Sequence, residues 1–240
     1  MDEGVYCTRH AMRATAEKRS DAAGFHSGPR LHVNPVEDAQ RPQEGTITLT
    51  LVQSRCYRPG MALRPIVLYP DPVLLTPTER VERIDDELVT LVQDMVETMH
   101  AAPGIGLAAN QVGVGKRVFV LDLSVGEKEE ELHVFINPKI VESSGSEVAE
   151  EGCLSFPDIH IDIERPFLAT IEAQGLDGKT FTLSARGLLA RAMQHEIEHL
   201  EGRVFIQNLS PLKRELMKRQ IKKRIKAGDW VATVERPQAP

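Results

Sequence analysis

The 240-residue chain has few cysteines and no long apolar run. Its cysteines are odd in number and widely spaced, which excludes a disulfide framework and favours a reducing compartment; they are Cys7, Cys56 and Cys153. No apolar stretch approaches the roughly 18 residues that a membrane-spanning helix requires, and the N-terminus lacks the basic-then-apolar order of a secretory signal. We therefore expect a cytoplasmic protein without a membrane partner.

Basic residues are also in the minority. Lys and Arg number 29 against 35 Asp and Glu, a formal net charge of -6, so the molecule as a whole should not attract DNA, although a local basic patch remains possible. Hydrophobic residues make up 41% and charged residues 27%, which excludes collagen-like, coiled-coil and wholly disordered classes.

Residues 1–60 differ in composition from the rest of the chain. They are polar, contain scattered glycine and proline, and show only one modest apolar alternation, at 46–52. Acidic residues near the start argue against an organelle-targeting peptide. We expect this N-terminal extension to lack stable structure.

Periodicity predicts an α+β fold for the remainder. Apolar residues at three- and four-residue steps indicate amphipathic helices, while short β-branched runs bounded by turn residues indicate strands. The predicted helices are 84–99, 187–201 and 212–227, and the predicted strands are 117–123, 133–141, 167–174 and 180–184. We expect short, mostly antiparallel strands around the helix at 187–201, with helices at both ends of the domain.

That central helix carries the pattern His-Glu-x-x-His. His195 and His199 are four residues apart, so on a helix both imidazoles can bind one metal ion. Glu196 then lies beside the ion and can act as a general acid and base. The alternative is a pair of helix histidines satisfied by ordinary hydrogen bonds.

A hydrolytic metal site needs a third protein ligand. One protease pattern takes its third ligand from a histidine at position 205, where this chain has Phe205. A second pattern takes a downstream glutamate, but the candidate, Glu215, lies in a strongly basic helix where an ion pair suits it better. Cys153, within the segment 151–155 (Glu-Gly-Cys-Leu-Ser), is the sensible ligand, because a bound metal deprotonates a thiol. A lone cysteine otherwise packs as a small hydrophobic residue.

A third segment, 104–111, reads Gly-Ile-Gly-Leu-Ala-Ala-Asn-Gln. It superficially matches a dinucleotide-binding pattern, but a helix precedes it and a strand follows, whereas that pattern requires the reverse. Its glycines allow the backbone to approach a ligand closely, and Gln111 offers an amide donor. A purely structural turn would explain the glycines equally well.

Together, the three segments occur in the order and at about the spacing of peptide deformylases, and the chain resembles that family from residue 61 to about 212. The resemblance implies an α+β catalytic domain at 61–212, followed by a basic helix and tail at 213–240. It implies removal of the formyl group from the initiator methionine of newly made polypeptides. It also implies that one divalent metal ion is bound. Fe²⁺ is the ion most expected, and Zn²⁺, Ni²⁺ and Co²⁺ are the alternatives.

The resemblance further implies roles for the chemical groups of the site. The metal ligands would be Cys153, His195 and His199. Glu196 would accept the proton of the attacking water and pass it to the departing amine. The side-chain amide of Gln111 and the backbone N–H of Leu154 would donate hydrogen bonds to the oxygen that becomes negative.

For the substrate, the resemblance implies a backbone contact and an apolar slot. The loop that contains Gly104 and Gly106 would pair with the peptide like an added strand. Ile105, Leu188 and Ala192 would line the slot for the methionine side chain.

Three positions depart from the usual family pattern. Glu198 replaces an aspartate, and we expect it to change only the packing beside the ligands. His160 replaces an arginine that helps bind peptide or product. Arg191 replaces an apolar residue of the slot, so we expect its charge to extend outward or to alter the preference for the first side chain. We also expect Arg165 to pair with Glu151 and to steady the cysteine strand.

The C-terminal segment is strongly basic. Residues 213–226 have eight cations against the single acid Glu215; they are Lys213, Arg214, Lys218, Arg219, Lys222, Lys223, Arg224 and Lys226. The segment is either a solvated helix face or a site that docks on ribosomal RNA near the nascent-chain exit. Two other functions remain open, a zinc endopeptidase and a catalytically silent, metal-bound module associated with the ribosome.

Overall fold

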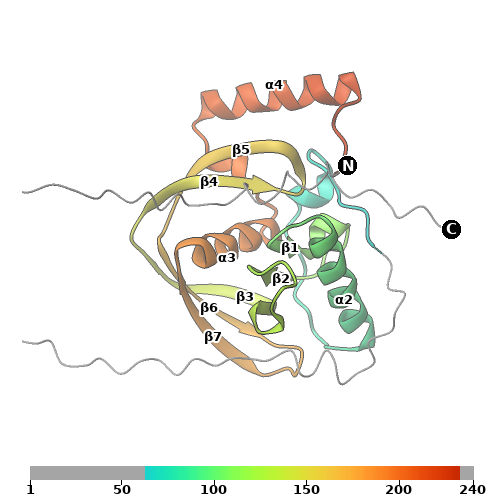
Figure 1. Ribbon diagram of the computed structural model, residues 1–240, viewed down its shortest axis with the longest axis vertical. Coiled ribbons are helices and arrows are strands. Elements are labelled where there is room, and N and C mark those ends of the chain that lie inside the picture. Colours follow the sequence, from blue (N-terminus) through green and yellow to red (C-terminus); the bar gives the residue numbers. More distant parts are fainter. Residues whose placement is uncertain (1–62, 233–240) are drawn as a thin grey trace, which may run out of the picture.

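A computed structural model describes residues 63–232 of the chain (Figure 1). The predicted N-terminal extension at 1–60 and the last residues of the predicted tail, 233–240, lie outside this range. The α-helices are α2 (Asp86–Ala101), α3 (Gly187–Leu200) and α4 (Pro211–Ala227), which confirms the three predicted helices within a few residues at each end. Short 3₁₀ turns are η1 (Pro72–Leu75), η2 (Ala109–Val112), η3 (Glu129–Glu131) and η4 (Phe205–Asn208). None of the helices between residues 63 and 232 has the length and apolarity needed to cross a membrane.

The strands form two antiparallel sheets. One has five strands in the order β1-β2-β3-β6-β7, and the other consists of β4 and β5 alone. Their bounds are β1 (Gly106–Ala108), β2 (Val118–Asp122), β3 (Leu132–Ser144), β4 (Glu147–Cys153), β5 (Phe156–Arg165), β6 (Leu168–Gln174) and β7 (Thr180–Arg186). The predicted strands correspond to β2, β3, β6 and β7. The sequence did not predict β1, β4 or β5.

Helix α3 occupies the centre of the domain. In Figure 1 the β4–β5 hairpin lies on one side of α3 and strands β3, β6 and β7 lie on the other, with α2 alongside β1 and β2. Every residue from Ala190 to Leu200 is buried, including Arg191, Glu196 and both histidines. Ionisable side chains are seldom buried on all faces of a helix, so this concentration of charge in the core indicates a functional site.

Three hydrophobic clusters hold the elements together. The first packs α2 against β1 and β2, and the second packs α3 against the five-stranded sheet. The third joins β5, η1, η4 and α4, where Phe156 stacks on Tyr69 and meets Phe205 and Trp230 edge-on. Within α4 only Ile221 is buried, and the helix runs across the outside of the domain beside β5 with most of its surface exposed (Figure 1).

Candidate metal centre

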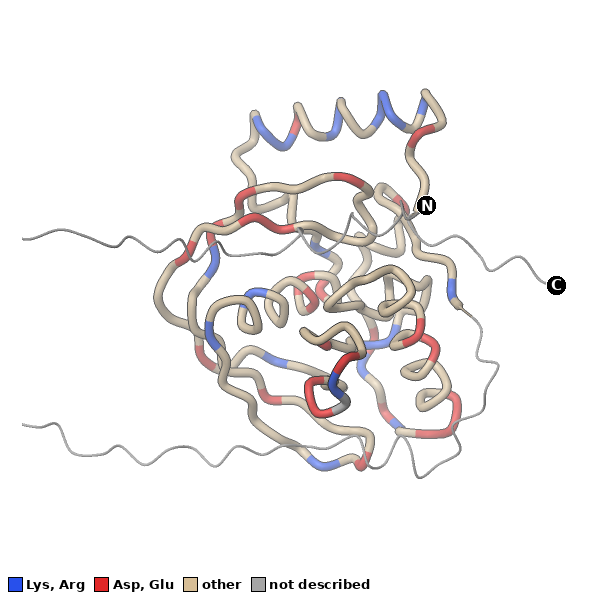
Figure 2. Tube along the Cα trace, in the orientation of Figure 1, with Lys and Arg blue, Asp and Glu red and all other residues tan. Residues whose placement is uncertain are grey.

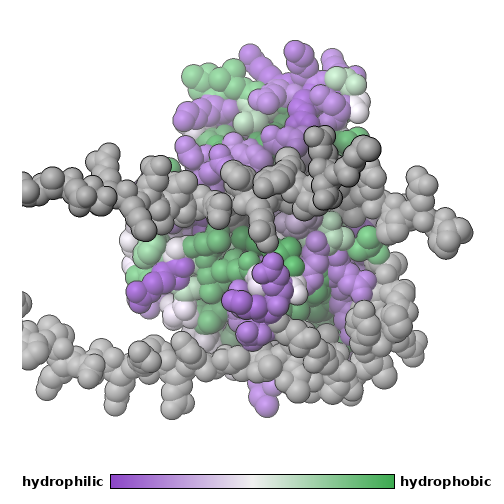
Figure 3. Space-filling model, viewed as in Figure 1, coloured by the Kyte–Doolittle hydropathy of each residue, from purple (hydrophilic) through white to green (hydrophobic). Residues whose placement is uncertain are grey.

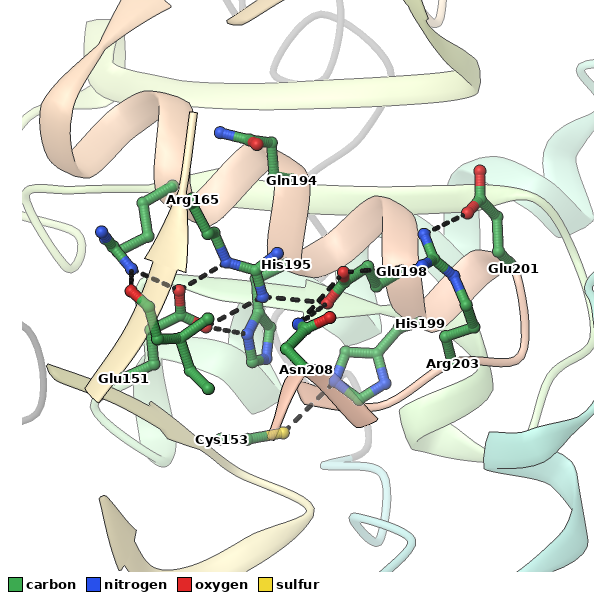
Figure 4. A network of polar contacts seen from close by, with 12 residues as sticks. Glu151, Cys153, Arg165, Gln194, His195, Glu198, His199, Glu201, Arg203 and Asn208 are labelled. Atoms are coloured by element: carbon green, nitrogen blue, oxygen red, sulfur yellow. Dashed lines mark hydrogen bonds and ion pairs between the residues drawn. The ribbon is translucent and has the colours of Figure 1, made fainter. Parts of the chain in front are cut away.

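The three predicted metal ligands meet in the structure. One ligand atom from each of Cys153, His195 and His199 lies within 4.8 Å of the other two, and the Cys153 Sγ atom is 3.2 Å from His199 Nε2. Figure 4 shows the thiol at the end of its strand facing the imidazoles of α3. A sulfur and two imidazole nitrogens are a donor set of the kind that holds a catalytic metal and leaves one position open.

The β4–β5 hairpin determines where the sulfur lies. Cys153 is the last residue of β4 and pairs with Phe156 across a two-residue turn, whereas Gly152 pairs with His160. Strand β5 therefore contains three extra residues, 157–159, between these two pairs. A bulge of this kind bends the strand and redirects neighbouring side chains. The cysteine consequently sits at a hairpin tip beside α3.

A buried carboxylate orients the first histidine. His195 Nδ1 donates to Oε2 of Glu151 over 3.0 Å, which leaves Nε2 free to bind an ion. Glu151 is fully buried and also accepts hydrogen bonds from Arg165, which confirms the predicted ion pair, and from Arg191. Burial raises the pKa of Glu151, but the hydrogen bonds from His195 and Arg165 outweigh it and lower the pKa to about 2. The carboxylate therefore remains ionised.

Two buried polar atoms beside the ligands lack partners. Oε2 of Glu196 and Nδ1 of His199 accept or donate no hydrogen bond within residues 63–232. Burial lowers the pKa of His199 well below its usual value, helped by the charge of Arg165, so its imidazole is neutral, as a metal ligand must be. Unpaired polar atoms in a core are costly. The unpaired oxygen of Glu196 and the neutral imidazole of His199, whose Nε2 faces the Cys153 sulfur, therefore fit a bound cation.

The predicted proton acceptor, Glu196, lies on the same helix. Burial raises the pKa of Glu196 to about 7, although the charge of Arg165 acts in the opposite direction. A carboxyl group with a pKa near the working pH exchanges protons most effectively in a reaction. The environment of Glu196 thus suits a general acid and base.

The predicted hydrogen-bond donors lie on two other segments. Gln111 is in η2, where its Oε1 accepts from the backbone N–H of Ala108 over 2.8 Å. Its Nε2 therefore points the opposite way and donates to Ser155 Oγ at 3.3 Å and to Cys153 Sγ at 3.6 Å. Leu154 follows Cys153 in the hairpin turn. Both groups are thus held next to the sulfur.

Strand β1 brings the glycine loop to the same place. A Cβ atom at Gly106 would lie 2.5 Å from Oε1 of Glu196, and one at Gly104 would lie 2.8 Å from the side chain of Leu154. A larger residue at either glycine would therefore displace the side chain of Glu196 or of Leu154. β1 is also an end strand of its sheet and pairs with β2 alone, so its other edge, apart from the Ala108 N–H that donates to Gln111, is available to a peptide.

The predicted slot residues are only partly brought together. Ile105 and Ala192 belong to one hydrophobic cluster, and Leu188 lies one helical turn before Ala192, half-buried. Hydrophobic side chains gather in the middle of the face in Figure 3, where Figure 1 places α3 and β1. A slot for methionine remains a prediction.

The three departures from the family pattern have different surroundings. Arg191 is only 2% exposed, so the expectation that its charge extends outward is wrong; backbone carbonyls of the hairpin and Glu151 bind the guanidinium inside. Glu198 accepts from Arg165 and Asn208 beside the ligands, in line with the expected local packing. His160 is exposed on β5.

The contacts from Glu151 to His195 and Arg191 were not predicted, although the acidic residue two positions before the cysteine was a usable signal.

Comparison with known proteins now decides the family. The family model described as polypeptide deformylase matches residues 63–215. A peptide deformylase of Acidobacterium capsulatum is 51% identical over 170 residues, which are 71% of this chain and all of that protein. The chain belongs to the peptide deformylase family. Among solved structures, a peptide deformylase from Legionella pneumophila is 42% identical with a TM-score of 0.64, covering 69% of this chain and 98% of that one.

A second solved structure agrees. The peptide deformylase of Ehrlichia chaffeensis in complex with actinonin is 41% identical with a TM-score of 0.63, and the match covers 68% of this chain and 98% of that one. The chain is accordingly a metal-dependent hydrolase that removes the N-formyl group from newly made polypeptides. The predicted α+β fold is confirmed by the same comparison.

The close approach of β1 to Glu196 gives a direct test. We expect Gly106→Ala to lower kcat/KM for a formyl-methionyl peptide by about a hundredfold, because the added methyl displaces the Glu196 carboxylate and misplacing a reacting group by about 1 Å has an effect of that size. Formate release measures the rate. Gly115→Ala is the control, since nothing lies within 4 Å of its Cβ position. Equal activity of the two variants would contradict this interpretation.

Proposed function

We propose that Cys153, His195 and His199 hold the metal ion of this deformylase and that the resident ion is Fe²⁺. The convergence of these ligand atoms beside an unpartnered carboxylate oxygen of Glu196 supports this assignment most strongly. A thiolate and two imidazoles also accept Zn²⁺, Ni²⁺ and Co²⁺. A divalent ion held there supplies positive charge that acidifies a water molecule and polarises the formyl carbonyl.

Glu196 moves the proton in this proposal. Its carboxylate accepts the proton of the water that attacks the formyl carbon and then delivers it to the nitrogen of the departing amine, so formate and a free N-terminus result. The close approach to Gly106 holds the carboxylate in place. General acid–base catalysis by one positioned group contributes about 10² to 10⁴ in rate.

Two donors stabilise the oxygen on which negative charge develops. They are the Nε2 group of Gln111, fixed by the Ala108 N–H bond to its Oε1, and the backbone N–H of Leu154. Each preorganised donor of this kind contributes about 3 kcal/mol in acyl-transfer reactions.

The substrate peptide lies along the free edge of β1. The backbone of residues 104–106 pairs with it, and the methionine side chain enters a slot formed by Ile105, Leu188 and Ala192, where dispersion favours a thioether.

We further assign residues 61–212 to the catalytic domain and place the enzyme in the cytoplasm. The extension at 1–60 and the basic segment at 213–240 lie outside the catalytic domain.

The central experiment combines one assay with one variant. Metal-replete protein should release formate from a formyl-methionyl peptide and leave an unformylated peptide intact. Glu196→Ala should reduce kcat by about 10² to 10⁴ while it keeps its metal. The control is Glu201→Ala, an exposed acid at the C-terminal end of the same helix. Full turnover by Glu196→Ala would refute the role of Glu196, and internal cleavage of the unformylated peptide would indicate an endopeptidase.

The basic C-terminal helix contacts the ribosome in this proposal. Figure 2 shows Lys and Arg spread along α4. Two of the cations hold the helix to the domain, since Arg214 donates to the Gln207 and Leu209 carbonyls and Arg224 donates to the Pro157 carbonyl. The others are exposed; they are Lys213, Lys218, Arg219, Lys222, Lys223 and Lys226. An exposed row of cations on an outer helix suits the phosphates of ribosomal RNA.

Charge neutralisation tests this contact without removing the helix. We expect the triple change of Lys213, Lys222 and Lys223 to Gln to weaken cosedimentation with ribosomes at low salt, and the wild-type interaction to fall steeply as salt rises. The control neutralises three exposed lysines elsewhere, Lys128, Lys139 and Lys179. Equal loss of binding in both triples, or no loss in either, would contradict a specific role for α4.

A further inference from the structure

Arg191 is a buried cation that the mechanism above does not use. It lies on α3 one helical turn before His195, and its side chain points into the β4–β5 hairpin. Nη1 donates to Oε1 of Glu151 at 2.7 Å and to the Ile163 carbonyl at 2.8 Å, and Nη2 donates to the Glu147 carbonyl at 2.8 Å. One guanidinium thus binds both strands of the hairpin and the carboxylate that orients His195.

We propose that Arg191 is a positioning residue that fixes the β4–β5 hairpin against α3 and thereby sets the distance from the Cys153 sulfur to the two histidines. The inference rests on the proposed metal site. It adds a residue that touches neither metal nor substrate but determines how well the three ligands meet.

The topology gives such a residue a structural task. β4 and β5 are hydrogen-bonded to each other and form a sheet of their own, so the ladder of the five-stranded sheet does not hold them. The proposed cysteine ligand is therefore on the β4–β5 hairpin, and the proposed histidine ligands are on α3. The relative position of the two depends on side chains that cross between them.

Arg191 extends from α3 into the hairpin, whereas Arg165 belongs to the hairpin itself. Arg165 is the last residue of β5, so its two bonds to Glu151 stay within the hairpin, and Glu198 is its contact on α3. Arg165 and Glu198 also line a half-open cavity of about 250 Å³, where water can replace a lost contact. Arg191 does not line that cavity and binds backbone atoms of both strands.

Removal of the guanidinium takes a hydrogen-bond donor from three acceptors of the hairpin. The carbonyls of Glu147 and Ile163 lose these donors, and Oε1 of Glu151 keeps only the bond from Arg165. The hairpin then shifts to satisfy these atoms elsewhere, and Cys153, at its tip, shifts with it. Lysine at position 191 keeps the charge but lacks the planar fork that reaches both strands, so it restores the geometry only in part.

Cobalt serves as the probe, because its spectrum reports the bound thiolate. Full-length wild-type and Arg191→Met proteins loaded with Co²⁺ are compared in two measurements, the sulfur-to-cobalt charge-transfer absorption and the rate of Co²⁺ release to an excess of chelator. We expect the absorption band to weaken or shift and release to become about 10- to 100-fold faster, the range found when supports of metal ligands are removed. Arg191→Lys should lie between the two.

The control is Arg64→Met. Arg64 forms a partly buried ion pair with Asp94 of α2, so its loss reports a general cost in stability without touching the hairpin. Wild-type absorption and release in Arg191→Met would overturn the inference. If Arg191→Met does not fold, Arg191→Lys carries the test, and wild-type behaviour in that variant overturns it equally. A wild-type protein that shows no sulfur-to-cobalt band would instead refute the proposed metal ligands.

Discussion

The buried carboxylate of Glu151 is the contact on which the site depends. It accepts hydrogen bonds from Arg165, Arg191 and His195, and these partners come from β5 and α3, while Glu151 itself belongs to β4. A buried charge that loses its partner costs about 3 to 5 kcal/mol, so the two arginines are as necessary as the acid. The same contacts fix the tautomer of His195 and hold the cysteine hairpin beside the central helix.

The position of α3 explains why so much charge lies in a core. The helix is enclosed by the hairpin on one side and the five-stranded sheet on the other, so a metal held there is shielded from bulk water (Figure 1). Burial raises the pKa of Glu196 and keeps the imidazole of His199 neutral. Stability alone favours apolar residues at such positions. The reaction supplies the reason for the polar ones.

Patterns local in the chain allowed much of the fold to be predicted. The helices have clear three- and four-residue periodicity, and β2 is a buried β-branched run. Strand β4 was missed because it has no apolar alternation, since Glu151 is buried and Val148 is exposed. Strand β5 does alternate isoleucine with polar residues over 159–164, a signal that was available and was not used. The motif also indicated His195 and His199 as ligands, and the resemblance added Cys153; the structure brings these three side chains together. The inward direction of Arg191 could not be predicted, because its acceptors lie 28 to 44 residues away in sequence.

X-ray absorption at the metal edge of protein purified without air tests the account most directly. Air is excluded because ferrous iron and thiolate both oxidise. The account predicts one sulfur neighbour at about 2.3 Å and two imidazole nitrogens at about 2.0 to 2.1 Å, distances typical of such ligands on zinc. A coordination sphere without sulfur, or one that keeps its sulfur in Cys153→Ala, would contradict it.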